Sequence, residues 1–261
     1  MKKAFVFLAN GFEEIEALAT VDILRRAGIT TTTVSITSSL QVTGAHGVEV
    51  KADTIFSDNK YSKNDWLITP GGMPGASNLA ACEPLTTLLK EHHAQGGNIA
   101  AICASPAVVL SPLGILEGKE ATCYPGFENE MNCGRIVNKP VIVDGNVITS
   151  NGPGNTIPFA LEIVVNAISL EKAREVASGM LIYRSQEELA FYDALTRPQA
   201  IKDFYENETL VAMTRELTEM LRKSRTIDWQ KKETARATMR KMVKRLLKKY
   251  KYPPEQYEDA I

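Results

Sequence analysis

Metal-binding residue patterns are scarce in this sequence. Its 261 residues include three histidines and four cysteines. The cysteines (Cys82, Cys103, Cys123 and Cys133) show no paired spacing of the kind that zinc sites use. We therefore expect no metal site.

A strong charge of either sign is also missing. The formal net charge is −1 at pH 7, so the composition gives no general attraction to nucleic acid or to an anionic membrane. The longest apolar runs have the length of strands, and we expect no membrane-spanning helix. The N-terminal stretch 1–8 is similar to the start of a signal peptide, but its apolar part is about five residues long, below the ~7–15 that such a segment needs. We expect a cytoplasmic protein with reduced cysteines.

Glycine is absent from the last part of the chain. All 17 glycines lie at or before Gly179, whereas residues 185–261 are dense in Glu, Lys, Arg, Leu, Met and Ala. A pattern of segments separated by glycine thus changes to a composition typical of helices. We predict an α/β domain over residues 1–184 and a helical module over residues 185–261, with the boundary within a few residues of Arg184.

The first 184 residues alternate between strand-like and helix-like segments. This alternation predicts a doubly wound, flavodoxin-like fold, in which a mostly parallel sheet carries helices on both faces. The expected strands are Ala4–Leu8, Thr31–Ile36, Trp66–Thr69, Asn98–Cys103 and Val147–Ser150. The expected helices are Glu14–Ala27, Pro84–Gln95, Ser105–Leu110 and Asn155–Ile168.

Two short antiparallel segments interrupt this alternation. One is Gln41–Val50, and the other is a hairpin over Val141–Ile148, because Asp-Gly favours a tight turn. In parallel sheets the site lies beyond the carboxyl ends of the strands. Residues that follow predicted strands therefore come to one edge, namely Asn10, Gly71, Cys103 and Asn151.

Cys103 ends an apolar strand and is followed by small residues that lead into a helix. Such a strand-to-helix turn resembles a nucleophile elbow. A helix N-terminus can lower the pKa of a cysteine from about 8.5 to roughly 3.5–7.5, which would suit a thiolate nucleophile or an oxidation sensor. The alternative is a buried structural thiol, since free cysteine is among the most buried residue types.

Other strand ends carry acidic and glycine-rich loops. Glu13, Glu14 and Glu16 follow the first strand, where acids complement a helix dipole, although Glu16 can instead share a proton with a thiol. The loop around Gly72 offers backbone amides to an oxyanion, or is only a turn. The loop that begins at Asn151 has the same two interpretations.

These motifs together resemble the ThiJ/PfpI family, in its small single-domain, deglycase-like branch associated with parkinsonism. The resemblance covers about 70% of the chain and rests on the order and spacing of five pieces. They are Asn10-Gly11-Phe12-Glu13-Glu14-Ile15-Glu16, Arg25-Arg26-Ala27-Gly28, Pro70-Gly71-Gly72-Met73-Pro74-Gly75, Ala100-Ala101-Ile102-Cys103-Ala104-Ser105-Pro106 and Ser150-Asn151-Gly152-Pro153-Gly154.

The resemblance implies roles for particular residues. Cys103 would be the nucleophile, and Glu16 the protonated partner of its thiolate. Gly72 and Ala104 would offer backbone amides to an oxyanion. The remaining residues expected to contact substrate are Tyr124, Asn151, Gly152 and Pro153.

Two positions depart from the family pattern. Relatives described as proteases have a histidine directly after the cysteine, where this sequence has Ala104. Some relatives have a histidine where this sequence has Tyr124, and tyrosine is a poor base near neutral pH. No Cys–His pair of the kind that drives peptide hydrolysis is therefore expected in the motif.

The chemistry that follows is a glyoxalase- or deglycase-like reaction on reactive dicarbonyls, without a cofactor. Cys103 would add to a small carbonyl substrate such as methylglyoxal, and Glu16 would move a proton between adjacent carbons. One alternative is a redox-sensing, chaperone-like stress protein that uses the same thiol. Another is a structural protein in which activity is incidental. The resemblance also implies a homodimer formed through the α/β domain.

The last part of the chain resembles the C-terminal helical region of type I restriction enzyme motor subunits. Segment 229–251 has ten Lys or Arg against one acid, Glu233. Such a helix can bind phosphates, but a solvated face is favoured, so nucleic acid is not an expected partner. We also expect the helix around Leu170–Met180 to continue through Arg184. The pairing of these two regions suggests an engineered fusion; a natural fusion or a mis-joined gene is the alternative.

Overall fold

The computed structural model describes residues 2–182, 191, 207–224 and 233–252. The chain divides into two compact units, Met1–Ala173 and Arg174–Ile261. This division precedes Arg184 because Arg215 of the second unit donates hydrogen bonds to the carbonyl of Arg174 and to the hydroxyl of Ser178.

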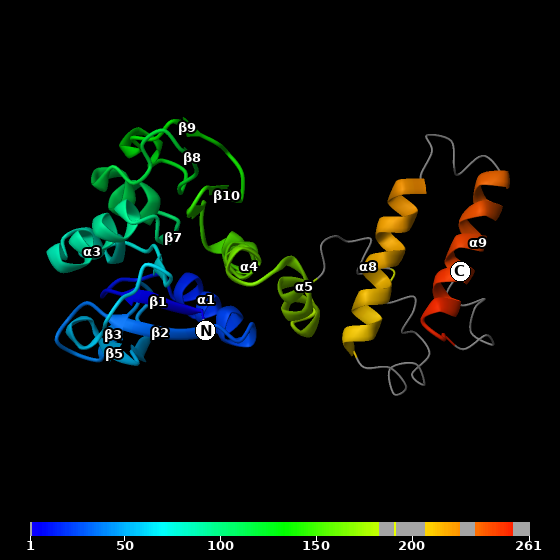
Figure 1. Cartoon of the computed structure of the whole chain (residues 1–261), viewed down its shortest axis with the longest axis horizontal. Coiled ribbons are helices and arrows are strands. Elements are labelled where there is room, and N and C mark those ends of the chain that lie inside the picture. Colours follow the sequence, from blue (N-terminus) through cyan, green and yellow to red (C-terminus); the bar gives the residue numbers. More distant parts are fainter. Residues whose placement is uncertain (1, 183–190, 192–206, 225–232, 253–261) are drawn as a thin grey trace. The chain divides into compact units, whose positions relative to one another are not determined.

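The first unit is built on a seven-stranded sheet with the order β10-β11-β7-β6-β1-β2-β5 (Figure 1). All neighbours are parallel except the β10–β11 hairpin. This confirms the predicted doubly wound α/β fold. The strands are β1 (Lys3–Leu8), β2 (Thr30–Ser35), β5 (Thr54–Ile55), β6 (Trp66–Thr69), β7 (Asn98–Ile102), β10 (Val141–Asp144) and β11 (Val147–Ser150).

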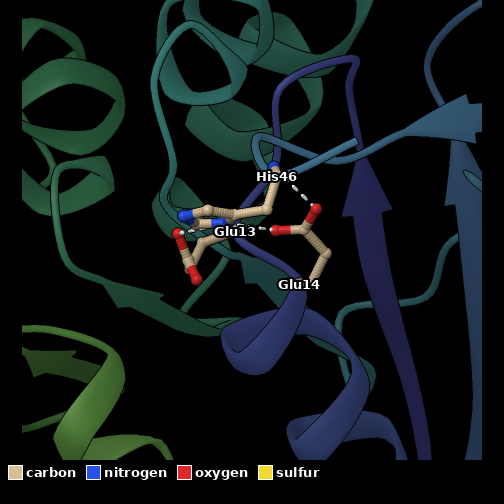
Figure 2. A group of neighbouring side chains, drawn as sticks. All are labelled: Glu13, Glu14 and His46. Carbon is tan, nitrogen blue, oxygen red and sulfur yellow. Dashed lines mark hydrogen bonds and ion pairs between the residues drawn. The ribbon is translucent and has the colours of Figure 1, made fainter. Parts of the chain in front are cut away.

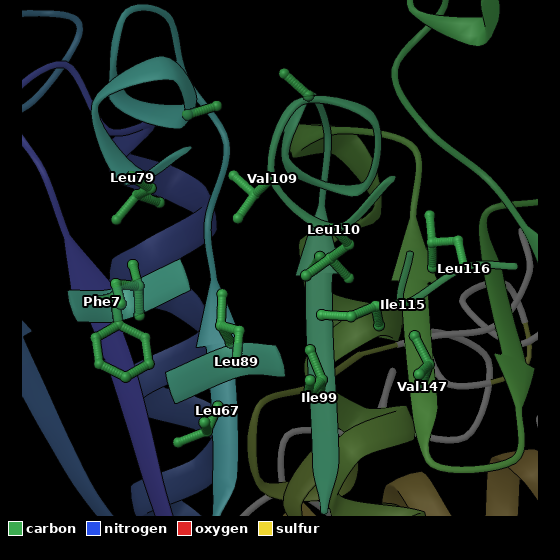
Figure 3. Close-up of a cluster of buried hydrophobic side chains, with 14 of the residues drawn as sticks. Phe7, Leu67, Leu79, Leu89, Ile99, Val109, Leu110, Ile115, Leu116 and Val147 are labelled. Carbon is green, nitrogen blue, oxygen red and sulfur yellow. The ribbon is translucent and has the colours of Figure 1, made fainter. Parts of the chain in front are cut away.

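Helices cover both faces of this sheet. The helices are α1 (Glu14–Arg26), α2 (Gly75–Ala80), α3 (Glu83–Ala94) and α4 (Thr156–Ala167). Side chains alternate between the faces of a strand, so Phe5 and Phe7 of β1 point to the same side. There they join one buried cluster with Leu79 of α2 and Leu89 of α3 (Figure 3). Helices α1 and α4 pack together and against the strands, α1 on β1 and α4 on β7 and β11.

The predicted elements agree with these bounds to within one residue at each end, apart from the segment after Cys103. That segment is a π-helical turn over Pro106–Leu110 instead of an α-helix. Both antiparallel excursions are present, one as β3 (Gln41–Thr43) with β4 (Glu49–Lys51) and the other as the β10–β11 hairpin. The remaining short elements are β8 (Glu120–Ala121), β9 (Arg135–Ile136) and 3-10 turns at Phe56–Asp58, Ser111–Leu113, Glu128–Glu130 and Pro153–Asn155.

The second unit contains α8 (Asn207–Ser224) and α9 (Glu233–Lys249), which pack on each other. Their apolar stripes form one core. Its buried members are Leu210, Met213, Leu217, Val243, Leu246, Leu247 and Tyr252. The basic residues of α9 from Arg240 to Lys249 are exposed, as a solvated face requires, and Lys249 pairs with Glu216 at 2.7 Å.

The expected continuation of the helix through Arg184 is wrong. Helix α5 spans Leu170–Gly179, and Leu181 then adopts a left-handed φ of 55°. The N–H of Ile182 donates to the carbonyl of Ala177, which closes the helix end with a reversed turn. Three segments carry the resemblance to restriction subunits: Glu188–Leu195, Ile227–Glu233 and Leu246–Pro253. Of these, residues 188–190, 192–195, 227–232 and 253 lie outside the described residues. No helix in the described ranges is long and apolar enough to cross a membrane.

Candidate functional site

The candidate site lies where the carboxyl ends of β6, β7 and β11 meet. Thr69 of β6 pairs with Ala101 of β7, so Gly71 and Cys103, each two residues further on, lie at the same level. Ser150 of β11 pairs with Ile102 of β7 in the same way, which places Asn151 beside Cys103. Sheet register thus brings together residues that are far apart in the sequence.

Cys103 stands on a sharp turn at the end of β7. Its φ of 66° is left-handed, a conformation that costs a non-glycine residue about 1–3 kcal/mol. Two backbone bonds hold it there. The Cys103 N–H donates to the Ser150 carbonyl at 2.9 Å, and the Cys103 carbonyl accepts from the Tyr124 N–H at 2.7 Å. The predicted elbow is therefore present.

Glu16 reaches this turn from the first turn of α1. Its side chain is 1% exposed, and its Oε2 accepts a hydrogen bond from the Gly71 N–H at 2.7 Å. Among the described residues, none donates to its buried Oε1. A carboxylate with one unpartnered buried oxygen is costly, so the site favours the neutral acid.

Gly71 separates Glu16 from Cys103 and allows them to approach. A Cβ at Gly71 would lie 2.8 Å from Glu16 Oε2, 2.5 Å from Cys103 Cβ and 3.1 Å from Cys103 Sγ. No side chain fits in that space. The carboxyl group and the sulfur therefore line the same small volume, close enough for each to shift the pKa of the other.

The two groups perturb each other strongly. Burial raises the pKa of Glu16 to about 7, against the opposing hydrogen bond from Gly71. Burial also raises the pKa of Cys103 to about 12, and the negative charge of Glu16 adds to the rise. Hydrogen bonds from the N–H groups of Gly72 and Ala104 act in the opposite direction and stabilise the thiolate.

The raised pKa of Cys103 is opposite to the expectation from the sequence, in which a helix N-terminus lowers the pKa of this cysteine. The sulfur is buried beside a carboxylate, and only a five-residue π-helical turn follows it. Because burial and the charge of the other group oppose ionisation of both, the pair loses its two protons one after the other, and a single proton is held between them in the interval. When Glu16 holds that proton, its negative charge is gone and the Gly72 and Ala104 amides still favour a thiolate.

The loop that carries Gly72 is held against the turn by Ser105. The Ser105 hydroxyl donates to the carbonyl of Pro70 at 2.6 Å, and Ser105 is fully buried. Gly72 has a φ of 89°, and a Cβ there would lie 2.3 Å from the backbone nitrogen of Glu13. These contacts fix the two amides that the sequence predicts as oxyanion donors.

The other predicted site residues lie around the same turn. Tyr124 is 43% exposed, and its ring lies beside Gly152, whose Cβ position would be 3.1 Å from the ring. Asn151 accepts a hydrogen bond from Asn155 through its side-chain oxygen, and Pro153 begins the 3-10 turn before α4. Their part in substrate binding stays a prediction.

Sequence reasoning missed the roles of Gly71 and Ser105. Gly71 was expected at the edge as part of a loop, but not as the donor to Glu16, and the Gly-Gly pair was the only indication in the sequence. It also missed a group formed by Glu13, Glu14 and His46, the one set of His, Cys, Asp and Glu side chains in the described residues with metal-ligand spacing.

We expect Gly71→Ala to slow alkylation of Cys103 by iodoacetamide about 10–100-fold, because a methyl group there overpacks the space between the sulfur and Glu16. Peptide-level mass spectrometry measures the rate. Gly154→Ala is the matched control, since a Cβ at Gly154 meets nothing within 4 Å. Equal rates in the two variants would contradict the proposed packing.

We also expect the alkylation rate of Cys103 to rise with pH through an inflection near pH 7. Below that value both groups hold their protons; above it the first proton leaves the pair and thiolate forms. Cys123 in the same sample is an internal control, because burial raises its pKa to about 11. If both thiols react only as the pH approaches about 11–12, the shared proton stays on the sulfur.

Two family models match the chain. The DJ-1/PfpI family model matches residues 2–166, and a model described as type I restriction enzyme HindI endonuclease subunit-like, C-terminal, matches residues 161–261. Both resemblances predicted from the sequence are confirmed. The two matches overlap over residues 161–166, in the second half of α4.

Individual relatives agree with the first match. Protein DJ-1 homolog B of Arabidopsis thaliana is 40% identical over 184 residues, which are 70% of this chain and 42% of that protein. The chain thus spans less than half the length of this relative, and 47% of the related homolog A. A glutathione-independent glyoxalase of Caenorhabditis elegans is 37% identical over 69% of this chain and 97% of its own length.

A solved structure shows the same fold. The oxidized DJ-1 of Toxoplasma gondii has a TM-score of 0.66 and 39% identity, over 70% of this chain and 99% of that one. The matched region includes the whole sheet and the turn that carries Cys103. Through residues 2–166, this chain belongs to the DJ-1/PfpI family.

Proposed function

We propose that the chain is a cysteine-dependent glyoxalase of the deglycase-like type, which converts reactive dicarbonyls such as methylglyoxal to hydroxy acids without a cofactor. The observation that carries the proposal is the geometry of Cys103 and Glu16, which are both buried and line the same small space beside Gly71. The name of the glyoxalase of Caenorhabditis elegans, at 37% identity, supports the same chemistry.

The first step forms a carbon–sulfur bond. The Cys103 thiolate attacks the aldehyde carbon of methylglyoxal, and the electron pair of the C=O bond moves to the oxygen. The N–H groups of Gly72 and Ala104, which already stabilise negative charge at this turn, lie where that oxyanion develops. Protonation of the oxygen by Glu16 gives a hemithioacetal.

The second step moves a proton between adjacent carbons. The Glu16 carboxylate removes the proton from the former aldehyde carbon, and the electron pair of that C–H bond forms an enediol with the neighbouring carbon. Glu16 returns its proton to the neighbouring carbon while the hydroxyl proton of the first carbon passes to the second oxygen, which gives a thioester of lactic acid on Cys103. Water then cleaves the C–S bond, so lactate leaves and the thiol is restored. A pKa near 7 suits Glu16 to both directions of transfer.

Peptide hydrolysis fits this site poorly. Ala104 occupies the position where protease-like relatives have a histidine, and Tyr124 occupies the position where some other relatives have one. The proton transfers of the site therefore fall to Glu16.

We expect Cys103→Ala to abolish methylglyoxal consumption and lactate formation, because no carbon–sulfur bond can form. Glu16→Gln should lower kcat by about 10²–10⁴-fold, the usual contribution of general acid–base catalysis. Cys82→Ala, which removes a half-buried thiol elsewhere, should keep the wild-type rate. Full turnover by Cys103→Ala would falsify the mechanism.

A redox-sensing, chaperone-like role is the second candidate, because the same strained thiol is the natural point of oxidation to sulfenic and sulfinic acid. Titration with peroxide alongside the methylglyoxal assay separates the two. Oxidation of Cys103 in a protein that never consumes methylglyoxal would favour the sensor. If neither reaction occurs, the chain is a structural protein whose active-site motif is incidental.

We further propose that the α/β unit forms a homodimer. Apolar side chains are exposed on two packed helices, with Ile15 58% and Leu18 39% exposed on α1 and Ile157 38% exposed on α4. Neighbouring exposed apolar groups of this kind mark an interaction surface, and a second copy of the chain is the occupant that the family resemblance implies.

Light scattering should therefore give a mass of two chains for the wild type and of one chain for Ile15→Glu, since a charge there would be buried unpaired. Lys63→Glu introduces the same side chain on an exposed loop and should stay dimeric. A monomeric wild type would rule the dimer out.

The joining of the two matched families supports an engineered fusion, and a genome locus that encodes the whole chain in one reading frame would contradict it. The four free cysteines support a reducing, cytoplasmic location, which cell fractionation tests.

A further inference from the structure

The turn between β3 and β4 brings His46 against the start of α1 (Figure 2). Its Nδ1 lies 2.8 Å from Glu14 Oε2 and 3.7 Å from Glu13 Oε2. One ligand atom from each of the three residues lies within 4.8 Å of the others. This group lies outside the machinery assigned to Cys103 and Glu16.

We propose that Glu13, Glu14 and His46 form a binding site for a divalent transition metal ion of the zinc class, with His46 Nδ1 and one oxygen of each carboxylate as ligands. The site is built from segments more than 30 residues apart, so no local spacing in the sequence indicates it.

The spacing of the three atoms fits such an ion. Zinc binds nitrogen and carboxylate oxygen at about 2.0–2.2 Å, so two ligand atoms of a tetrahedral ion lie about 3.4 Å apart. The His46–Glu14 contact would open slightly from 2.8 Å, and the His46–Glu13 contact would close slightly from 3.7 Å. An imidazole among the ligands favours a transition metal over Mg²⁺ or Ca²⁺.

Backbone hydrogen bonds to Oε1 hold the Glu14 carboxylate in place. Its Oε1 accepts hydrogen bonds from the backbone N–H groups of His46 and Val48, at 2.8 Å and 3.4 Å, which leaves Oε2 directed at the imidazole. A Cβ at Gly44 would lie 2.3 Å from that same Oε1, so the glycine leaves room for the carboxylate. Oriented ligands of this kind are typical of metal sites.

The turn itself is tied to the strand end from which α1 begins. The Gly11 N–H donates to the Thr43 carbonyl, and the Ala45 N–H donates to the Phe12 carbonyl, both at 2.8 Å. The three ligands therefore keep their separation without an ion present. The His46 side chain is 70% exposed, which leaves the remaining coordination positions open to water.

Charge also favours a divalent ion over a simple ion pair. A proton on His46 offsets only one of the two carboxylates, whereas a divalent cation offsets both. Glu13 and Glu14 are both largely shielded from solvent, with side chains 14% and 11% exposed, so their mutual repulsion is poorly screened by water.

Isothermal titration of the chelator-treated full chain with Zn²⁺ tests the site, and we expect one ion per chain. His46→Ala and Glu13→Gln should each weaken binding by about 10–100-fold or more, because each removes a ligand. His93→Ala, which removes a histidine of α3, and Cys103→Ala, which removes the reactive thiol, should bind as the wild type does.

Substitution by Co²⁺ gives a second readout, since a tetrahedral N/O site has a visible absorption spectrum that His46→Ala should lose. Wild-type protein that binds no Zn²⁺, or His46→Ala with undiminished affinity, would overturn the proposal. Loss of binding in Cys103→Ala would place the ion at the thiol instead. None of these outcomes depends on methylglyoxal turnover, so the test stands apart from the proposed function.

Discussion

The contact between Glu16 and Cys103 across Gly71 is the constraint on which the site depends. It needs three things at once: a helix that begins directly after β1, a strand end that places a cysteine at a left-handed turn, and a residue without a side chain between them. The parallel register of β6 and β7 supplies the alignment. The helices on both faces of the sheet and the buried cluster hold these strand ends in alignment.

Much of this fold could be predicted from the sequence because the strands are short apolar runs separated by glycine turns. β6 and β11 have the predicted bounds, and the Asp144-Gly145 pair marks the turn of the β10–β11 hairpin. The prediction was wrong at the end of α5, where the helix propensity of the sequence competes with the turn that closes the helix. The residues after Gly179 have good helix propensity, yet α5 ends there with a bond from the Ile182 N–H to the Ala177 carbonyl, and Arg215 of α8 contacts the Arg174 carbonyl. The Arg215 contact comes from a distant part of the sequence, so the local pattern that suggested a helix could not show it.

The candidate site likewise has features that could be predicted from the sequence and features that could not. Cys103 and Glu16 follow from their positions at strand ends and from family motifs, and the structure places them together. The direction of the cysteine pKa did not follow, because it depends on burial and on a carboxylate 87 positions away rather than on the following helix. The His46 group was also invisible, since its partners meet only after β3 and β4 fold back on the start of α1. An interaction is hard to predict from the sequence when only the fold brings its partners together.

The depth of the sulfur has a consequence for the choice of reactants. Cys103 is 9% exposed, and the backbone of Gly71 lies against its side chain. A thiol buried to this extent is expected to select its reactants by size, so that two- and three-carbon aldehydes and peroxide react with it faster than glutathione or the thiol of a folded protein. The thiol would then be spared from mixed disulfides in the cell even while it reacts readily with the smallest electrophiles.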